Sequence, residues 1–151
     1  NIFLLAGEAG QELFNSPDGL QFDRLGRLWV QTDGNFTNVN AFAGHGNNQM
    51  LVADLDAGTV QRFLVGPSGC EVTGVTWTPD MRTMFVDIQH PGEVGGTHPN
   101  GINPATGTRY TDADLVADPT AFSTWPDGAT ASRPRSGTIV VRRTDGGIIG
   151  T

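Results

Sequence analysis

The chain has 151 residues, 37% of them hydrophobic, with 21 glycines, 9 prolines and a formal net charge of −7 at pH 7. This length is that of one domain with enough apolar residues for a core, and the glycine and proline content is typical of a turn-rich protein rather than a helical one. The negative charge disfavours binding to nucleic acid or to an anionic membrane, and no apolar run approaches the roughly 20 residues of a membrane-spanning helix.

The first predicted element is a short apolar strand at Ile2–Ala6. The chain starts without an initiator methionine or a signal peptide, so we expect it to be a piece of a longer protein. Cys70 is the single cysteine, which excludes an internal disulfide. A lone cysteine directly before a strand is typical of a small buried side chain.

A β-hairpin is predicted over residues 16–34. Leu20 and Phe22 alternate with polar neighbours in its first strand, and Gly26 allows the positive φ that a tight turn requires. Asp18 stands at the start of that strand, directly after the chain has turned, so its carboxylate can point at a ligand. A long loop over residues 33–48, rich in glycine and asparagine, follows the hairpin.

Two further strands, at 49–54 and 59–65, complete a four-stranded blade over about residues 16–66. The hairpin pattern returns over residues 71–90, and an offset of about 55 residues is near the repeat length of a β-propeller blade. We therefore predict an all-β protein with about two four-stranded antiparallel blades, the second over about residues 70–150.

The second blade contains a long insertion, about residues 91–136, in which only Asp112–Ala117 is predicted to form a helical turn. Strands at 137–143 and 147–150, joined by a turn at 144–146, are predicted to complete it. Two blades do not close a ring. We expect their open edges to pair with upstream blades of the same protein or with a second copy of the chain.

Asp18 and Glu71 open the first strands of the two successive blades. The innermost strands of a propeller line a central channel, so both carboxylates are expected to meet at one end of it. Oxygen ligands in an acidic cavity suit Ca²⁺ or another oxygen-preferring cation. The alternative is that Asp18 only stabilises its turn and that Glu71 is a solvated charge at a strand edge.

Other polar residues are weaker candidates. Asp23, Asp33 and Asp80 lie beside predicted turns, which favours a structural role. His90 ends a strand three residues before Glu93, and such a pair can ligate a metal or contact a phosphate, although a loop histidine more often does neither. The chain contains no P-loop, no serine nucleophile elbow and no zinc-type histidine spacing.

Four segments carry the motifs of a known family: residues 17–30, 71–74, 78–93 and 133–150. Together they resemble the C-terminal part of the PhoX family of bacterial alkaline phosphatases over nearly the whole chain. The run Ile88-Gln89-His90-Pro91-Gly92-Glu93 is the most specific piece. The first hairpin is shared with other calcium propellers, notably the gluconolactonase-like and paraoxonase-like families.

The resemblance implies a six-bladed propeller, exported by the twin-arginine route to the periplasm or secreted, that hydrolyses phosphate monoesters at a cluster of Fe³⁺ and Ca²⁺ ions. It implies that Asp18 and Glu71 are metal ligands, with Glu93 a weaker candidate. The family's cysteine ligand belongs to an N-terminal portion outside this chain, so Cys70 does not take that role. Most of the metal ligands would come from other blades, and the isolated piece is expected to hydrolyse little or nothing.

Two alternatives stay open at this point. The shared hairpin also permits a calcium-dependent lactonase of gluconolactonase type. The other alternative is a non-catalytic propeller portion that serves as a binding scaffold.

Overall fold

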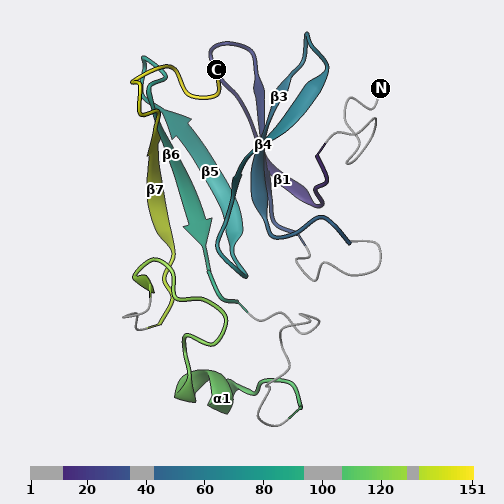
Figure 1. Ribbon diagram of the computed structural model, residues 1–151, viewed down its shortest axis with the longest axis vertical. Coiled ribbons are helices and arrows are strands. Elements are labelled where there is room, and N and C mark those ends of the chain that lie inside the picture. Colours follow the sequence, from purple (N-terminus) through teal and green to yellow (C-terminus); the bar gives the residue numbers. More distant parts are fainter. Residues whose placement is uncertain (1–11, 35–42, 94–106, 129–132) are drawn as a thin grey trace.

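The computed structural model describes residues 12–34, 43–93, 107–128 and 133–151, which form an all-β fold with one short helix (Figure 1). The predicted strand at Ile2–Ala6 lies outside these residues. No helix within the described ranges is long and apolar enough to cross a membrane. The elements are β1 (Pro17–Phe22), β2 (Leu28–Thr32), β3 (Gln49–Asp54), β4 (Thr59–Val65), β5 (Glu71–Trp77), β6 (Thr83–Gln89), α1 (Asp112–Ala117) and β7 (Gly137–Arg142).

Strands β1 to β4 form one antiparallel sheet in the order of the sequence, as predicted for the first blade. The turn between β1 and β2 is closed by Gly26, whose φ is 80° and whose N–H donates to the carbonyl oxygen of Asp23 at 3.1 Å. A β-bulge interrupts the β1–β2 pairing at Asp18, between Pro17 and Gly19. Such a bulge turns a side chain away from the regular alternation of the strand.

Strands β5, β6 and β7 form a second antiparallel sheet. This sheet also has a bulge near the start of its first strand, at Gly74, whose φ is 50°. A Cβ at Gly74 would lie 2.8 Å from Oδ2 of Asp87, so a larger residue does not fit there without a shift. The bulged hairpin is therefore repeated, as expected of consecutive propeller blades.

The main core lies between the two sheets. Trp29 is fully buried in it, with its ring 4.9 Å from that of Phe63 in an edge-on arrangement and 5.5 Å from that of Trp77. Met84 and Val86 of β6 complete the contact from the second sheet. Truncation of a buried aromatic residue costs about 3–5 kcal/mol, so this cluster contributes substantially to the association of the two sheets.

The outer face of the first sheet is also apolar. Leu20 and Phe22 of β1 pair with residues of β2 that point away from the second sheet, and they are 62% and 55% exposed. In the repeat, their counterparts in β5 are Val75 and Trp77, which pack against the first sheet. Along β1 the first sheet thus exposes the side chains whose counterparts the second sheet buries, whereas Val30 and Leu51 on the same face are buried in a second core cluster with Phe14.

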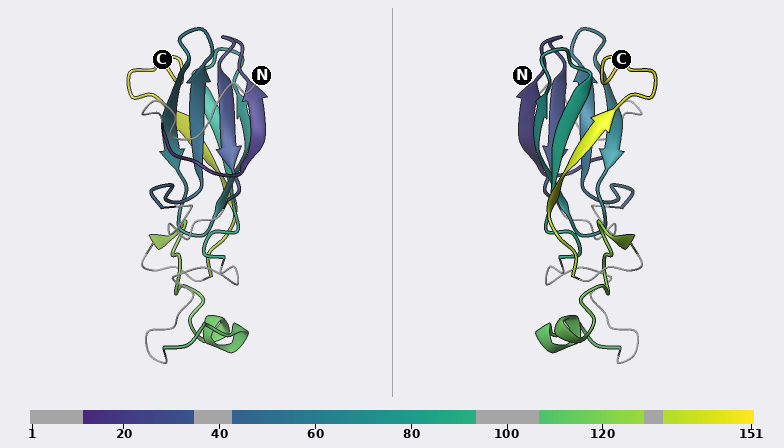
Figure 2. Two further views of the ribbon diagram at one scale, coloured as in Figure 1. Left: turned by 90° about the vertical axis from the view of Figure 1, so that its right-hand side faces the viewer. Right: turned by 90° about the vertical axis from the view of Figure 1, so that its left-hand side faces the viewer.

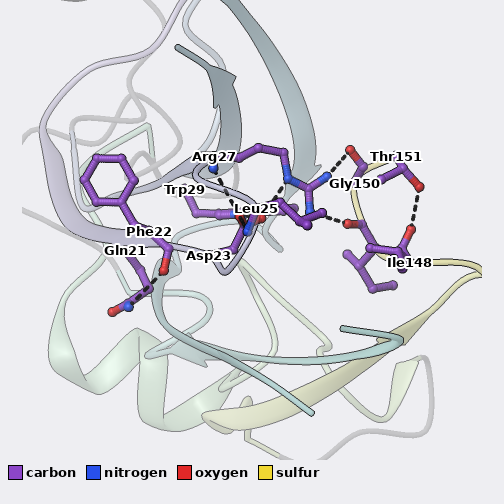
Figure 3. A network of polar contacts seen from close by, with 10 residues as sticks. Gln21, Phe22, Asp23, Leu25, Arg27, Trp29, Ile148, Gly150 and Thr151 are labelled. Carbon is purple, nitrogen blue, oxygen red and sulfur yellow. Dashed lines mark hydrogen bonds and ion pairs between the residues drawn. The ribbon is translucent and has the colours of Figure 1, made fainter. Parts of the chain in front are cut away.

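The predicted fourth strand of the second sheet, at residues 147–150, is wrong: this segment is a loop that returns to the first sheet. Ile149 is only 1% exposed in the core beside Trp29, and its N–H donates to the carbonyl oxygen of Met81 at 3.0 Å. The guanidinium of Arg27 donates to the carbonyl oxygens of Ile149 (2.7 Å) and Gly150 (Figure 3). These contacts satisfy the backbone without a strand ladder.

Helix α1 confirms the predicted helical turn. It is closed at its N-terminus by a capping box, in which Thr111 Oγ1 accepts from the N–H of Asp114 (3.2 Å) and the Asp114 carboxylate accepts from the N–H of Thr111 (2.8 Å). The helix lies beyond the end of the sheets at which β6 finishes (Figures 1 and 2). The inserted segment therefore stands over that end of the fold.

Candidate metal centre

Three potential metal ligands meet at the end of the sheets that faces α1. Asp33 directly follows β2, Glu71 is the first residue of β5, and His90 directly follows β6. One ligand atom from each lies within 4.8 Å of the others. Antiparallel pairing brings Glu71 close to His90, because Glu71 pairs with Gln89 at the end of β6. The contact between β2 and β5 brings Asp33 to the same point.

Glu71 is the buried member of the cluster, with 7% of its surface exposed. Its Oε2 accepts a hydrogen bond from Nε2 of Gln89 and lies 3.6 Å from Nε2 of His90. A buried carboxylate is costly to desolvate unless a positive charge or several donors compensate it. A cation shared with Asp33 and His90 would supply that compensation.

His90 is held by contacts on its other side. Its Nδ1 lies 3.1 Å from Oε2 of Glu93 and 3.4 Å from the carbonyl oxygen of Gly69, and its backbone N–H donates to Oγ of Ser136 at 3.0 Å. The residue has a φ of 38°. A carboxylate at one ring nitrogen is the usual way to orient a histidine whose other nitrogen binds metal. Glu93 therefore orients the imidazole so that Nε2 faces Glu71.

The buried amide of Asn48 connects the segments that carry the two acidic members of the cluster. Its Oδ1 accepts from Oγ1 of Thr32 (3.0 Å) and from the N–H of Gly34 (2.8 Å), the two neighbours of Asp33. Its Nδ2 donates to the carbonyl oxygen of Cys70 (2.9 Å), the neighbour of Glu71, and to that of Gly34 (3.3 Å). Both polar atoms of the amide are thus used to fix the spacing between Asp33 and Glu71.

The donor set decides which cations fit. Two carboxylates and one imidazole suit a transition-metal cation that accepts both oxygen and nitrogen ligands. Ca²⁺ takes six to eight oxygen ligands, so these three residues would fill only a small part of its shell. The described cluster therefore fits a cation that accepts nitrogen as well as oxygen ligands better than it fits Ca²⁺.

The predicted ligands Asp18, Glu71 and Glu93 have different places in the structure. Glu71 belongs to the cluster. Glu93 contacts it through His90, and Asp18 is exposed on the bulge of β1, outside the group that the described residues form. The sequence predicted only a turn role for Asp33, and its place in the cluster was missed. The available signal was that Asp33 follows the end of β2, and in an antiparallel hairpin the end of β2 lies beside the start of β1, where Asp18 was predicted to be a ligand.

Two other aspartates have the predicted turn roles. The Asp23 carboxylate accepts from Nε1 of Trp29 (2.8 Å), from Nε of Arg27 (2.7 Å) and from the N–H of Leu25 (2.9 Å). Burial alone would raise the pKa of Asp23, but the hydrogen bonds from Trp29 and Arg27 outweigh it and lower the pKa below its ordinary value of 3.8. Asp80 accepts from Oγ1 of Thr78 at 2.6 Å in the β5–β6 turn, which lowers its pKa.

Cys70 is fully buried beside Glu71. Desolvation raises the pKa of its thiol to about 12. The sulfur packs in the main core, and a Cβ at Gly66 would lie 2.3 Å from it. The predicted role as a small apolar side chain agrees with this position, because a thiol that stays protonated is a poor metal ligand and a poor nucleophile.

Two consecutive antiparallel sheets that gather carboxylate and imidazole ligands at one end define a β-propeller protein with a candidate metal centre. The family model described as alkaline phosphatase PhoX matches residues 3–92, which is more than half of the sequence. The chain belongs to the PhoX family.

A solved structure supports this assignment. Pseudomonas fluorescens PhoX, described in complex with vanadate, a transition state analogue, is 46% identical in sequence and superposes with a TM-score of 0.72 over 94% of this chain. The chain spans 20% of the length of that protein. A comparison with curated proteins gives no match.

Proposed function

We propose that residues 1–151 are the C-terminal part of a longer PhoX-type alkaline phosphatase that hydrolyses phosphate monoesters. The observation that carries the proposal is the cluster of Asp33, Glu71 and His90, in a chain 46% identical to a PhoX that is described with a transition state analogue bound. Fe³⁺ and Ca²⁺ are the proposed metals, and the periplasm or the cell exterior is the proposed location. The match to a phosphatase family does not favour the lactonase or scaffold alternatives.

Each residue of the cluster has a proposed role. Asp33 and Glu71 would hold a cation through their carboxylates and His90 through Nε2, while Gln89 and Glu93 keep the side chains of Glu71 and His90 in place. A bound cation supplies positive charge that offsets the repulsion between an acidic protein and a phosphate dianion and stabilises charge in the transition state.

Asp18 and Glu93 remain proposed ligands of a larger metal cluster. Asp18 has the exposed position on a strand bulge that such a ligand needs, and Glu93 lies beside His90. A second cation, with an oxygen-rich shell of the kind that Ca²⁺ prefers, would also take ligands from other blades.

The rest of the phosphatase is the proposed partner of the outer face of the first sheet. Leu20 and Phe22 expose there the face that the second sheet buries through Val75 and Trp77. A preceding blade would cover them in the same way. Without it the chain is expected to hydrolyse little or no ester and to self-associate through its open sheet edges.

The proposal is tested by measuring the phosphatase activity of the full-length protein and of a variant in which one residue of the cluster is replaced. Glu71→Gln keeps the size of the side chain and removes its charge, and we expect kcat/KM for p-nitrophenyl phosphate to fall by about 100-fold or more. Glu12→Gln makes the same change at a surface ion pair with Arg62 (3.2 Å) and is expected to leave activity unchanged.

Unchanged turnover by Glu71→Gln would overturn the proposal. Hydrolysis of a lactone but not of a phosphate monoester by the unmodified protein would favour the gluconolactonase-type alternative. A full-length protein that binds neither Ca²⁺ nor iron in calorimetry would favour the scaffold.

A further inference from the structure

A pocket of about 470 Å³ lies between the candidate metal centre and helix α1. His90 of the centre and Glu93, which contacts His90, form one part of its lining. Leu115 and Val116 of α1 form another part, and Arg133 also borders it. The pocket thus borders the candidate metal centre at His90, one of the three residues that would hold the cation.

The walls of the pocket are mostly apolar. Six apolar side chains contribute to the lining: Pro91, Leu115, Val116, Pro119, Phe122 and Pro134. A volume of several hundred Å³ with apolar walls and a few polar groups is typical of a small-molecule site. Moving an apolar group of aromatic size from water to such walls would lower the free energy of binding.

The pocket is tied to the loop that leads into Glu71. The N–H of Gly92 donates to the carbonyl oxygen of Ser68 at 2.7 Å, and the N–H of Glu93 donates to that of Gly69 at 3.3 Å. On the opposite side, the rings of Tyr110 and Phe122 are 4.9 Å apart in an edge-on contact. The two hydrogen bonds fix Gly92 and Glu93 against the loop before Glu71, and the aromatic contact packs Phe122 of the lining on Tyr110.

Beside the carboxylates of Glu93 and Asp112, the lining of the pocket contains the guanidinium of Arg133. Its side chain is exposed and has no carboxylate partner among the described residues, whereas the nearby Arg135 pairs with Asp127 at 2.8 Å. A guanidinium at the pocket attracts an anionic ester and matches the geometry of phosphate oxygens.

We propose that this pocket binds the organic group of the phosphate ester and favours aromatic or other bulky apolar alcohols over small polar ones. The inference rests on the proposed phosphatase function. The phosphoryl group faces the metal centre at His90, the organic group lies along Leu115 and Val116, and Arg133 attracts the anion.

The test compares two variants of α1 in the full-length phosphatase. Val116 lines the pocket and is 72% exposed, so Val116→Asp puts a charge on the apolar wall without disturbing a core. Ala117→Asp puts the same charge on the next residue, which is exposed and does not line the pocket. The substrates are p-nitrophenyl phosphate, which is aromatic, and glycerol 2-phosphate, which is small and polar.

We expect Val116→Asp to lower kcat/KM for p-nitrophenyl phosphate by about tenfold, mainly through KM, and to change glycerol 2-phosphate hydrolysis by less than about twofold. Ala117→Asp should change neither substrate by more than about twofold. An equal effect of Val116→Asp on both substrates, or no effect on the aromatic one, would overturn the pocket assignment.

A binding measurement separates this inference from the proposed function. Phenylphosphonate and methylphosphonate carry the same anionic group with and without an aromatic ring, and neither is hydrolysed. Tighter binding of phenylphosphonate that Val116→Asp abolishes supports the pocket even in a protein that turns over no ester. Equal affinity for the two phosphonates contradicts it even in an active phosphatase.

Discussion

Nδ2 of Asn48 donates to the carbonyl oxygen of Cys70 at 2.9 Å, and this bond joins the loop that carries Asp33 to the strand that carries Glu71. Asn48 is 3% exposed, so removal of its amide leaves several buried groups without partners. We expect Asn48→Ala to weaken iron binding by about 10-fold or more, since residues that position metal ligands typically have effects of this size. Calorimetric titration with Fe²⁺ under anaerobic conditions measures it.

The neighbouring Gln49 provides a matched control. It is equally buried, but its amide donates to the carbonyl oxygen of Leu13 at 2.8 Å, away from the cluster. Gln49→Ala should lower the free energy of unfolding by a similar amount, about 1–3 kcal/mol, and leave the iron affinity intact. Equal losses of affinity in the two variants would show that Asn48 acts only through general stability.

The imidazole of His90 is the nitrogen donor of the candidate centre and is expected to influence which metal it prefers. We expect His90→Ala to lower the affinity for Fe²⁺ by about tenfold or more and the affinity for Ca²⁺ far less, because Ca²⁺ selects oxygen ligands. His45→Ala is the control, since His45 contacts Asn15 (3.4 Å) and is not a member of the cluster. A parallel loss of Ca²⁺ and Fe²⁺ affinity in His90→Ala would argue against a nitrogen ligand.

The network around Asp23 makes stability depend on pH. Its pKa in the folded protein lies below its unfolded value near 3.8, so its contribution is fully present above about pH 4 and is lost as the pH falls through the folded value. We expect Asp23→Asn to lower the free energy of unfolding by about 1–3 kcal/mol at pH 7 and by less at pH 3. Urea titrations at the two pH values measure the difference.

Asp56, which is exposed in the β3–β4 turn, is the control for Asp23. Asp56→Asn is expected to change the free energy of unfolding by no more than about 0.5 kcal/mol. An Asp23→Asn variant whose loss of stability is the same at pH 3 and pH 7 would contradict the ionic part of the network.

Ile149 anchors the C-terminal loop to both sheets. Because it is 1% exposed beside Trp29, Ile149→Ala should cost about 2–4 kcal/mol of unfolding free energy. Ile148 is only partly buried, and Ile148→Ala should cost about 1 kcal/mol or less. Thermal unfolding of both variants distinguishes them, and equal midpoints would show that the loop does not dock as described.

Local patterns in the sequence were sufficient to predict most of the fold. The alternation around Leu20 and Phe22 and the turn glycine Gly26 predicted the first hairpin, and the repeat over residues 71–90 predicted the second. These signals are reliable because alternation and turn chemistry act between residues close in sequence.

Local patterns could not show that residues 147–150 form a loop rather than a fourth strand of the second sheet. Thr144-Asp145-Gly146 has the composition of a hairpin turn, and Asp145 accepts from the N–H of Gly147 at 2.8 Å. The segment after it nevertheless leaves the sheet, because burial of Ile149 and the bonds from Arg27 stabilise a path back to the first sheet. That competition is decided by tertiary contacts, which override the local pattern.

The candidate centre was predicted in part for a similar reason. Glu71 was predicted as a ligand from its place at the start of an inner strand, and His90 was weighed as one from its place at a strand end. Asp33 is far from Glu71 in the sequence, and the contact between β2 and β5 brings the two residues together. Its local sequence is that of an ordinary turn, so its role depends on the packing of the sheets.

The apolar outer face at Leu20 and Phe22 has a consequence for biosynthesis. If this chain follows other blades in a longer protein, as we propose, a ribosome completes those blades first. The apolar face of each newly made blade can then pack on a folded neighbour as soon as the blade emerges from the ribosome, before the ring closes. Assembly in this direction would limit the time during which the growing polypeptide is exposed to aggregation.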